Sequence, residues 1–262
     1  MRGKERDLYQ HFRPEEQPLI DAVLDWCKRV GSRHDRKLTD FLDPRQQQVV
    51  VAVAGTFPDV RVAFFGGMDS AERKRALIHP SEWEPAREDF QISLFEIHYS
   101  KKFAKIRHAD VLGSLTGLGV KREKYGDILM AEGRVQFFAA AEIADFLRFH
   151  FNHVGKMPVT LAQKSPDEVL PVREEWDVKT VTVSSLRLDA VLAAATAHPR
   201  KKIQADILHG AVKVNWTPVD EGSLLLEEGD VISYRGFGRL KLLEIGGRTK
   251  KGKWRILAGR IK

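Results

Sequence analysis

The sequence predicts an α+β protein in three parts: a small αβ domain over residues 1–80, a second αβ domain over 81–165 and a basic αβ domain over 178–262. We call these the N-terminal, middle and C-terminal parts. Helical and alternating apolar periods are mixed along all 262 residues. An acidic stretch with two prolines, 163–177, is predicted to be a linker before the last part. Residues 184–262 hold 15 Lys and Arg against 8 Asp and Glu, which accounts for the whole net charge of +7.

Composition indicates an ordinary globular protein, with 43% hydrophobic and 30% charged residues. No apolar run approaches membrane-spanning length, and the first ten residues lack the core of a signal peptide. Cys27 is the single cysteine, so an intramolecular disulfide is impossible. We therefore expect a cytoplasmic protein without a membrane partner. Positive charge gathered in one part favours a polyanion, and nucleic acid in particular.

The N-terminal part is predicted to contain two helices and a strand. Apolar residues over 19–30 recur at helical spacing, which points Cys27 into a core, and Gly31 is expected to end this helix. Asp43-Pro44 is typical of an N-cap followed by proline at the first helical position. The other features expected here are a strand over 60–65 and a charged connection over 71–76.

The middle part alternates strands and helices in the order β-α-β-β-α-β. The expected elements are strands over 89–99, 127–131, 135–139 and 158–162 and helices over 108–118 and 141–153. This order is the split ferredoxin-like arrangement, which RNA-recognition domains share. The strand at Val135–Phe138 lacks the glycine and basic residues of their aromatic motif. Direct RNA contact and a purely structural role therefore both stay open for this part.

The C-terminal part combines two short helices with strands and a basic tail. Leu188, Val191, Leu192 and Ala195 form one apolar helix face. A second helix over 200–208 opens with three basic residues, and Gly210 follows its end. Strands are expected over 212–214, 231–235, 239–245 and 254–258, the last two joined by the basic turn 246–253 into a β-hairpin.

The order of these features resembles the small RNA-binding domain named after ribosomal protein S-four. The residues that carry the resemblance are Arg187-Leu188-Asp189, Arg200-Lys201-Lys202, Gly210, Val212–Asn215 and Gly229–Ile232. Trp216 departs from the pattern, and we expect it either to lie over the strand or to stack on a base. The resemblance implies RNA binding through the basic face of this domain. Asp189 is expected to be structural, because it lies in the first turn of that domain.

Over nearly its whole length the chain also resembles the YlmH family of bacterial RNA-binding proteins. The motifs are HFRPEE at 11–16, FLDPRQ at 41–46, FGG and AERKRA within 65–76, LGSLTGLGVKREKYGDI at 112–128 and GRLKLLEIGGRTKKGK at 238–253. The resemblance implies a non-catalytic RNA-binding protein, connected with the large ribosomal subunit, of a kind often encoded beside cell-division genes.

Motifs that would indicate an enzyme are incomplete. Residues 247–253 have the spacing of a phosphate-binding loop, but Trp254 follows where Ser or Thr would hold magnesium. His150 and His153 are predicted on one helix without the further ligands that a metal site needs. We expect no metal, no cofactor and no small-molecule substrate. The alternative is an RNA-modifying enzyme, of the pseudouridine synthase or methyltransferase class, whose C-terminal part only docks the RNA.

The function predicted from the sequence is therefore non-catalytic binding of structured RNA, ribosomal RNA or tRNA, on the ribosome by a monomeric protein. The primary surface is expected to combine the cations that open the two helices with Lys213. The predicted RNA-binding residues are Arg187, Arg200, Lys201, Lys202, Lys213, Arg235, Arg239, Arg248, Lys250, Lys251 and Lys253.

Overall fold

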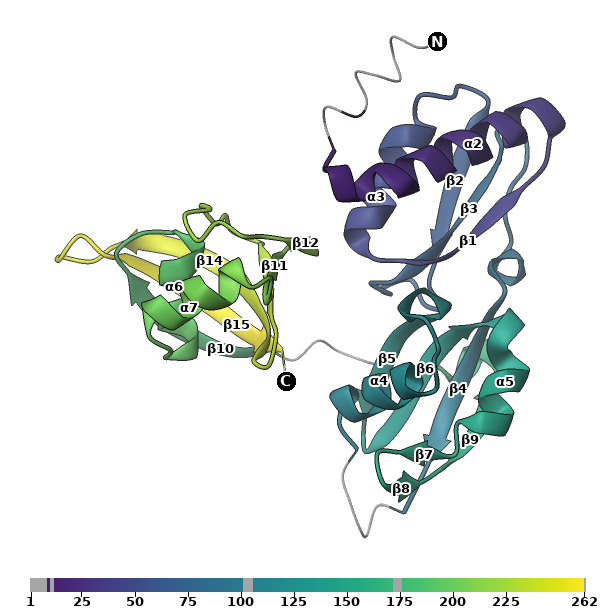
Figure 1. Cartoon of the computed structure of the whole chain (residues 1–262). Helices are drawn as coiled ribbons and strands as arrows, with labels where there is room; N and C mark the ends of the chain where they lie inside the picture. The colour runs from purple at the N-terminus through teal and green to yellow at the C-terminus, as the bar shows by residue number, and fades with distance from the viewer. Residues whose placement is uncertain (1–8, 10–11, 101–105, 172–175, 262) are drawn as a thin grey trace. The chain divides into compact units, whose positions relative to one another are not determined.

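The computed structural model describes Tyr9 and residues 12–100, 106–171 and 176–261. The chain divides into two compact units, Met1–Val172 and Arg173–Lys262 (Figure 1). The first unit contains the N-terminal and middle parts, and the second contains the C-terminal part. His11 of the first motif and residues 172–175 of the predicted linker lie outside the described residues. The mixture of helices and strands confirms the predicted fold class, whereas the three domain boundaries stay a prediction.

The N-terminal part is a three-stranded antiparallel sheet with the order β1-β3-β2, packed against two helices (Figure 1). Its elements are η1 (Pro14–Glu16), α2 (Gln17–Arg33), β1 (Lys37–Leu42), α3 (Pro44–Ala54), β2 (Val60–Phe65) and β3 (Lys74–Pro80). Cys27 lies fully buried among these elements, as predicted, and burial raises the pKa of its thiol to about 11. Asp43 caps α3 as predicted, since the Gln46 amide donates to its carboxylate at 2.9 Å.

Two expectations for the N-terminal part are wrong. Gly31 lies inside α2, and the helix ends only where His34 adopts a left-handed φ of 54°. The charged segment 71–76 is not a connection, because β3 begins at Lys74 and pairs with both β1 and β2. Every residue of β3 after Lys74 is buried, and the sequence conceals this because Arg75 and His79 occupy two of the buried positions.

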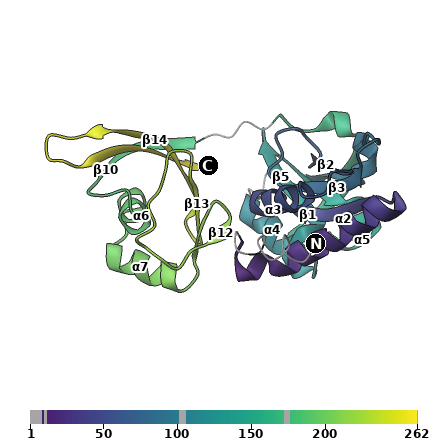
Figure 2. The same cartoon turned by 90° about the horizontal axis from the view of Figure 1, so that it is seen from above.

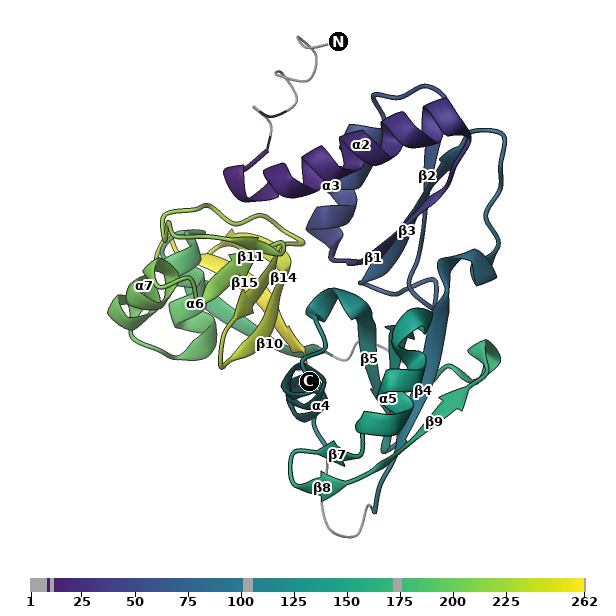
Figure 3. The same cartoon turned by 45° about the vertical axis from the view of Figure 1, so that its right-hand side comes forward.

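The middle part has the predicted β-α-β-β-α-β order and the ferredoxin-like sheet. Its main elements are η2 (Arg87–Phe90), β4 (Ile92–His98), α4 (His108–Gly117), η3 (Arg122–Lys124), β5 (Tyr125–Ala131), β6 (Arg134–Ala140), η4 (Ala141–Ile143), α5 (Ala144–His150) and β9 (Thr160–Lys164). The four strands pair antiparallel in the order β5-β6-β4-β9. Helices α4 and α5 lie on one face of this sheet (Figure 3) and share a core with Phe95, Phe137 and Tyr125.

The helix predicted over 141–153 is shorter than expected. It consists of η4 and α5 and ends at His150, and a two-stranded ribbon follows, β7 (His153–Val154) with β8 (Met157–Pro158). His150 and His153 therefore do not lie on one helix.

The predicted linker over 163–177 is largely part of the two folded units. Its first two residues belong to β9, and Trp176 opens β10 of the second unit. Between them, η5 (Pro166–Glu168) leads to Leu170, which is 2% exposed and packs on the sheet face opposite α4 and α5. Gln136, fully buried on β6, accepts a hydrogen bond from the Leu170 amide at 2.9 Å and donates to the Glu168 carbonyl at 2.9 Å.

The second unit is a six-stranded antiparallel sheet in the order β10-β15-β14-β13-β11-β12, with two helices. The elements are β10 (Trp176–Val183), α6 (Leu188–Thr196), α7 (Arg200–Leu208), β11 (Val212–Val214), β12 (Thr217–Pro218), β13 (Val231–Tyr234), β14 (Gly238–Arg248) and β15 (Trp254–Ile261). Both helices lie on the same side of the sheet (Figure 2). Buried residues from the helices and from every strand except β12 form one core there.

The basic tail is the β-hairpin that the sequence predicts. Its strands β14 and β15 pair from Leu240 with Arg260 to Arg248 with Trp254. The hairpin is an integral part of the sheet, because β14 also pairs with β13 and β15 also pairs with β10. The basic turn therefore extends from the middle of the sheet. In the described part of the chain, no helix combines the length and apolarity needed to cross a membrane.

Candidate nucleic-acid interface

A buried carboxylate clamped by two arginines lies where α6 and α7 begin. Asp189 is fully buried, and Arg200 Nη2 lies 2.9 Å from each of its carboxylate oxygens. Arg187 donates to the same carboxylate through Nε and Nη2, each at 3.2 Å, and Gln204 Nε2 donates at 2.8 Å. Arg187 precedes α6, whereas Arg200 and Gln204 lie in the first turns of α7. The Asp189 cluster thus joins the N-terminal ends of both helices.

The Asp189 carboxylate is ionised at neutral pH. Burial raises its pKa, but hydrogen bonds from Arg187, Gln204 and Arg200 outweigh burial and lower the pKa to about 2. The Arg187 and Arg200 side chains remain 38% and 45% exposed. Because a guanidinium carries five N–H donors, each arginine can be held by Asp189 and still donate to a second anion.

The loop after β12 fixes the start of α6. The Leu188 amide donates to the Leu224 carbonyl at 2.8 Å, and the Asp189 amide donates to the Gly222 carbonyl at 3.1 Å. A Cβ atom added to Gly222 would lie 3.2 Å from the Asp189 Cβ. Glycine therefore allows the loop to approach the buried carboxylate closely.

The predicted cations fall into separate groups. Lys201 and Lys202 are exposed in the first turn of α7, beside the Asp189 cluster and at the positive end of the helix dipole. Lys213 and Arg239 project from the opposite sheet face, since their neighbours Val212, Val214 and Leu240 belong to the core under the helices. The structure therefore does not bring Lys213 together with the helix cations.

Two further groups complete the predicted set. Arg235 follows β13 and donates to the Gly210 carbonyl at 3.4 Å, near the end of α7. At the hairpin turn, Lys250, Lys251 and Lys253 are exposed, and the Arg248 guanidinium lies 4.7 Å from the centre of the Trp254 ring.

Trp216, for which the sequence allows two roles, lies in a turn of the sheet. Asn215 and Trp216 form a tight turn between β11 and β12, with φ values of 48° and 63°. The Arg239 guanidinium lies 5.8 Å from the centre of the Trp216 ring. Trp216 therefore lies beside the outer strands, next to a predicted RNA-binding cation.

Comparison with known proteins places the chain in a family. Three family models match it in succession: "YlmH, N-terminal" over residues 15–83, "Putative RNA-binding domain in YlmH" over 85–168 and "S4 domain" over 186–232. The chain is also 43% identical over 256 residues to the "Ribosome-associated protein quality control protein P2" of Bacillus subtilis (strain 168), across 98% of this chain and 99% of that protein. The chain belongs to the YlmH family.

A solved structure of the YlmH family is similar to the structure of this chain. It is the "Cell division protein ylmH from Streptococcus pneumoniae", with a TM-score of 0.53 and 33% sequence identity, covering 62% of this chain and 98% of that chain. The predicted resemblances to the YlmH family and to the S-four domain are both confirmed.

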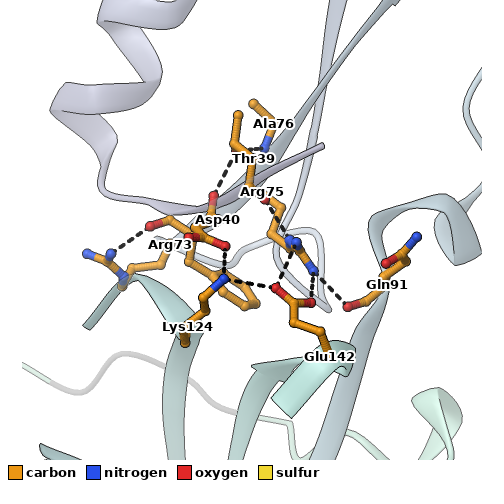
Figure 4. Close-up of polar contacts among 9 residues, drawn as sticks. Thr39, Asp40, Arg73, Arg75, Ala76, Gln91, Lys124 and Glu142 are labelled. Carbon is orange, nitrogen blue, oxygen red and sulfur yellow. Dashed lines mark hydrogen bonds and ion pairs between the residues drawn. The ribbon is translucent and has the colours of Figure 1, made fainter. Parts of the chain in front are cut away.

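Two YlmH motifs meet where the N-terminal and middle parts adjoin (Figure 4). Arg75 of the AERKRA motif is 4% exposed and donates to the Thr39 carbonyl at 2.7 Å and to the Gln91 carbonyl at 3.0 Å. Its guanidinium also lies 3.2 Å from the Glu142 carboxylate of the middle part. Lys124, from the long motif at 112–128, binds the same Glu142 at 3.1 Å. These motif charges hold the two parts together.

Further contacts at this junction are made by the backbone. The Asp127 carboxylate accepts hydrogen bonds from the amides of Glu72 at 2.6 Å and Arg73 at 3.1 Å. Burial raises the pKa of Asp127. Gly67, with a φ of 99°, lies so close to Phe138 that an added Cβ atom would come within 2.3 Å of its ring. Sequence reasoning missed this junction because a run of charged residues normally indicates a solvated surface.

The sheet of the middle part does not offer the open face on which RNA-recognition domains stack bases. Leu94, Leu129 and Phe138 on that face are at most 3% exposed, covered by Phe41 and Leu170. Any RNA contact by the middle part would use other surfaces, such as the exposed Lys121.

The candidate phosphate-binding and metal-binding residues do not form such sites in the described part of the chain. The phosphate-loop spacing at 247–253 forms the hairpin turn, where the Thr249 amide donates to the Lys253 carbonyl at 2.7 Å, and no helix follows. Among the described residues, no three His, Cys, Asp or Glu side chains come together to hold a metal ion.

Proposed function

We propose that this protein binds structured RNA, ribosomal RNA or tRNA, on the ribosome without catalysing a reaction. The observation that carries the proposal is the Asp189 cluster, which presents Arg187 and Arg200 beside the exposed Lys201 and Lys202. The B. subtilis relative is named as a ribosome-associated quality control protein, and its likeness extends over the whole chain. We therefore propose a ribosomal complex as the partner. The protein acts in the cytoplasm as a monomer and needs no small-molecule substrate.

The chemistry of the cluster fits phosphates better than base edges. Two guanidinium groups held by one carboxylate, two lysines and a helix N-terminus converge on a small area. Such groups neutralise phosphates and recognise the shape of an RNA helix, whose deep major groove excludes side chains. Binding at this surface should weaken steeply with salt, because phosphate contacts release counterions.

The test is a double charge reversal, Lys201→Glu with Lys202→Glu, followed by cosedimentation with ribosomes and separated large subunits. We expect the variant to stay in the supernatant while its thermal unfolding stays within about 0.5 kcal/mol of the parent, because both side chains are exposed. Arg200 is left intact, since a glutamate there would face the buried Asp189.

The control is Lys28→Glu with Arg33→Glu, which makes the same change in net charge on the exposed side of α2 in the other unit. It should cosediment like the parent. Undiminished binding by the Lys201/Lys202 variant would move the interaction elsewhere. Chemical alteration of the bound RNA would instead favour the enzyme alternative.

A further inference from the structure

The sheet of the second unit has a face turned away from α6 and α7, which we call the outer sheet face. Its residues alternate along each strand with those that pack under the helices. Val178 on this face is 45% exposed, although it lies on β10 in the same sheet as the fully buried Leu242 and Ile256. The outer sheet face consists of Trp176, Val178, Thr180, Thr182, Lys213, Pro218, Val231, Ser233, Arg239, Lys241, Leu243, Glu244, Arg255, Leu257, Gly259 and Ile261.

Three cations form a row across this face. Lys213 on β11 is directly opposite Ser233 on β13, which is in turn opposite Arg239 on β14. Lys241 follows Arg239 two residues along the same strand, about 7 Å away on the same face. Ser233 separates Lys213 from Arg239, so the row spans three neighbouring strands.

Two tryptophans lie against this row. The Trp216 ring centre is 5.8 Å from the Arg239 guanidinium, and the Trp176 ring centre is 5.9 Å from Lys241 Nζ. Gly259 lies beneath Trp176, since an added Cβ atom would come 3.0 Å from the Trp176 Cβ. Its missing side chain allows the tryptophan to lie across the strands.

This arrangement has the chemistry of a platform for unpaired nucleotides. Aromatic rings offer faces on which bases stack, and cations at their edges meet the phosphates between the bases. A base-paired helix would hide its base faces from the rings. This face carries one carboxylate, Glu244, and four cations, Lys213, Arg239, Lys241 and Arg255. An anionic strand is therefore electrostatically complementary to the face.

We propose that the outer sheet face is a second RNA site, which binds single-stranded RNA by stacking bases beside Trp176 and Trp216 and by neutralising phosphates with Lys213, Arg239 and Lys241. It lies on the side of the sheet away from the two helices, so it is distinct from the surface around Asp189. One protein could then hold a paired and an unpaired segment of RNA at once.

The experiment compares two full-length variants and two RNAs by fluorescence anisotropy. One RNA is a labelled strand of about 12 uridines, within the range of single-strand site sizes, and the other is a closed hairpin without unpaired ends. The triple variant Lys213→Gln/Arg239→Gln/Lys241→Gln should bind the uridine strand about tenfold more weakly near 0.1 M salt. The slope of log affinity against log salt concentration should fall by about 2 in magnitude. The same variant should bind the hairpin RNA like the parent.

Lys201→Gln/Lys202→Gln is the matched control, and it should give the opposite pattern. Hairpin binding that is unchanged in this control would contradict the function proposed above but not the second site. A single-strand affinity unchanged in the Lys213/Arg239/Lys241 variant would overturn the second site, as would equal losses for both RNAs. Melting curves of both variants check that they are folded.

A second measurement tests stacking. Trp216→Leu keeps apolar bulk but removes the ring, and it should weaken the uridine strand about tenfold. It should not weaken a strand of the same length without bases. If the strand without bases bound the parent as tightly as the uridine strand, or if poly-aspartate competed as well as RNA, the site would be one for acidic polymers and the proposal would be wrong.

Discussion

At the scale of single residues, buried charge is the feature that ordinary sequence patterns conceal. Asp189 and Arg75 are 0% and 4% exposed, although both side chains are charged and Arg75 lies in a run of charged residues. Each is buried with its partners. A carboxylate or guanidinium without partners would cost several kcal/mol, whereas these two groups are hydrogen-bonded on several sides. Asp189 holds Arg187 and Arg200, whose side chains remain partly exposed. Arg75 binds the Glu142 carboxylate, which also binds Lys124.

Asp189→Asn should remove a part of the stability that depends on pH. The folded pKa of Asp189, about 2, lies below the ordinary value near 3.9, so its contribution is present above about pH 4 and is lost as the pH falls towards 2. This difference corresponds to about 2 kcal/mol at neutral pH. Urea unfolding at a series of pH values should show a shallower acid decline for the variant than for the parent.

Glu96 provides an internal check on this acid behaviour. A hydrogen bond from Arg134 outweighs burial and lowers the pKa of Glu96 to about 2, and this pair lies in the first unit. Its contribution to the acid decline should be the same in the parent and in Asp189→Asn. Parallel pH profiles for the two proteins would show that Asp189 does not titrate as described.

At the scale of elements, the segment after β9 is docked to its own unit. Acidic residues and prolines at 165–171 suggest a free linker. Gln136 nevertheless binds the Glu168 carbonyl and the Leu170 amide of this segment, and the Leu170 side chain packs into the core of the covered sheet face. The local sequence specifies an irregular chain without specifying where that chain lies.

Gln136→Ala should release this segment. The Leu170 amide should exchange slowly with deuterium in the parent, because it donates to a fully buried side chain. The variant should lose that protection and about 1–3 kcal/mol of unfolding free energy, since the buried Leu170 amide and the Glu168 carbonyl lose their partner. Gln163→Ala, at an exposed position on β9, is the control and should leave the exchange of Leu170 unchanged. Rapid exchange of this amide in the parent would contradict the docked arrangement.

At the scale of the whole molecule, the N-terminal and middle parts form one compact unit, and the C-terminal part with its positive charge forms another. The motifs that mark the YlmH family divide between two tasks. Those within 41–46, 65–76 and 112–128 build the junction inside the first unit, whereas the tail motif builds the sheet and hairpin of the second. A family motif therefore need not lie at a binding surface.

Arg75→Ala should weaken the first unit as a whole. It would leave the Thr39 and Gln91 carbonyls without their donor and Glu142 with Lys124 as its remaining partner, at a cost of about 3 kcal/mol. Arg87→Ala, which removes a pair between side chains 72% and 87% exposed, should cost less than about 0.5 kcal/mol. Urea unfolding of the two variants provides the measurement, and comparable losses would mean that the junction adds little stability.

Local patterns by themselves determined the fold class, most element positions and the charge asymmetry. Helical spacing placed Cys27 in a core, the Asp43 cap and proline located the start of α3, and the order of elements predicted the ferredoxin-like sheet. The resemblances to the YlmH family and to the S-four domain also rest on the sequence alone. These features could be predicted because periodicity, capping and turn chemistry act over a few residues.

Only the tertiary structure decided which charged residues are buried and which face each one occupies. Arg75 and Glu142 are 67 residues apart in the chain, and Asp189 of α6 meets Arg200 of α7. The sequence groups Lys213 with the helix cations, but strand register places it across Ser233 from Arg239. No pattern in the sequence connects Lys241 with Trp176. The reason is physical: the solvation of a charge depends on partners brought close by the fold, and spacing along the chain does not record them.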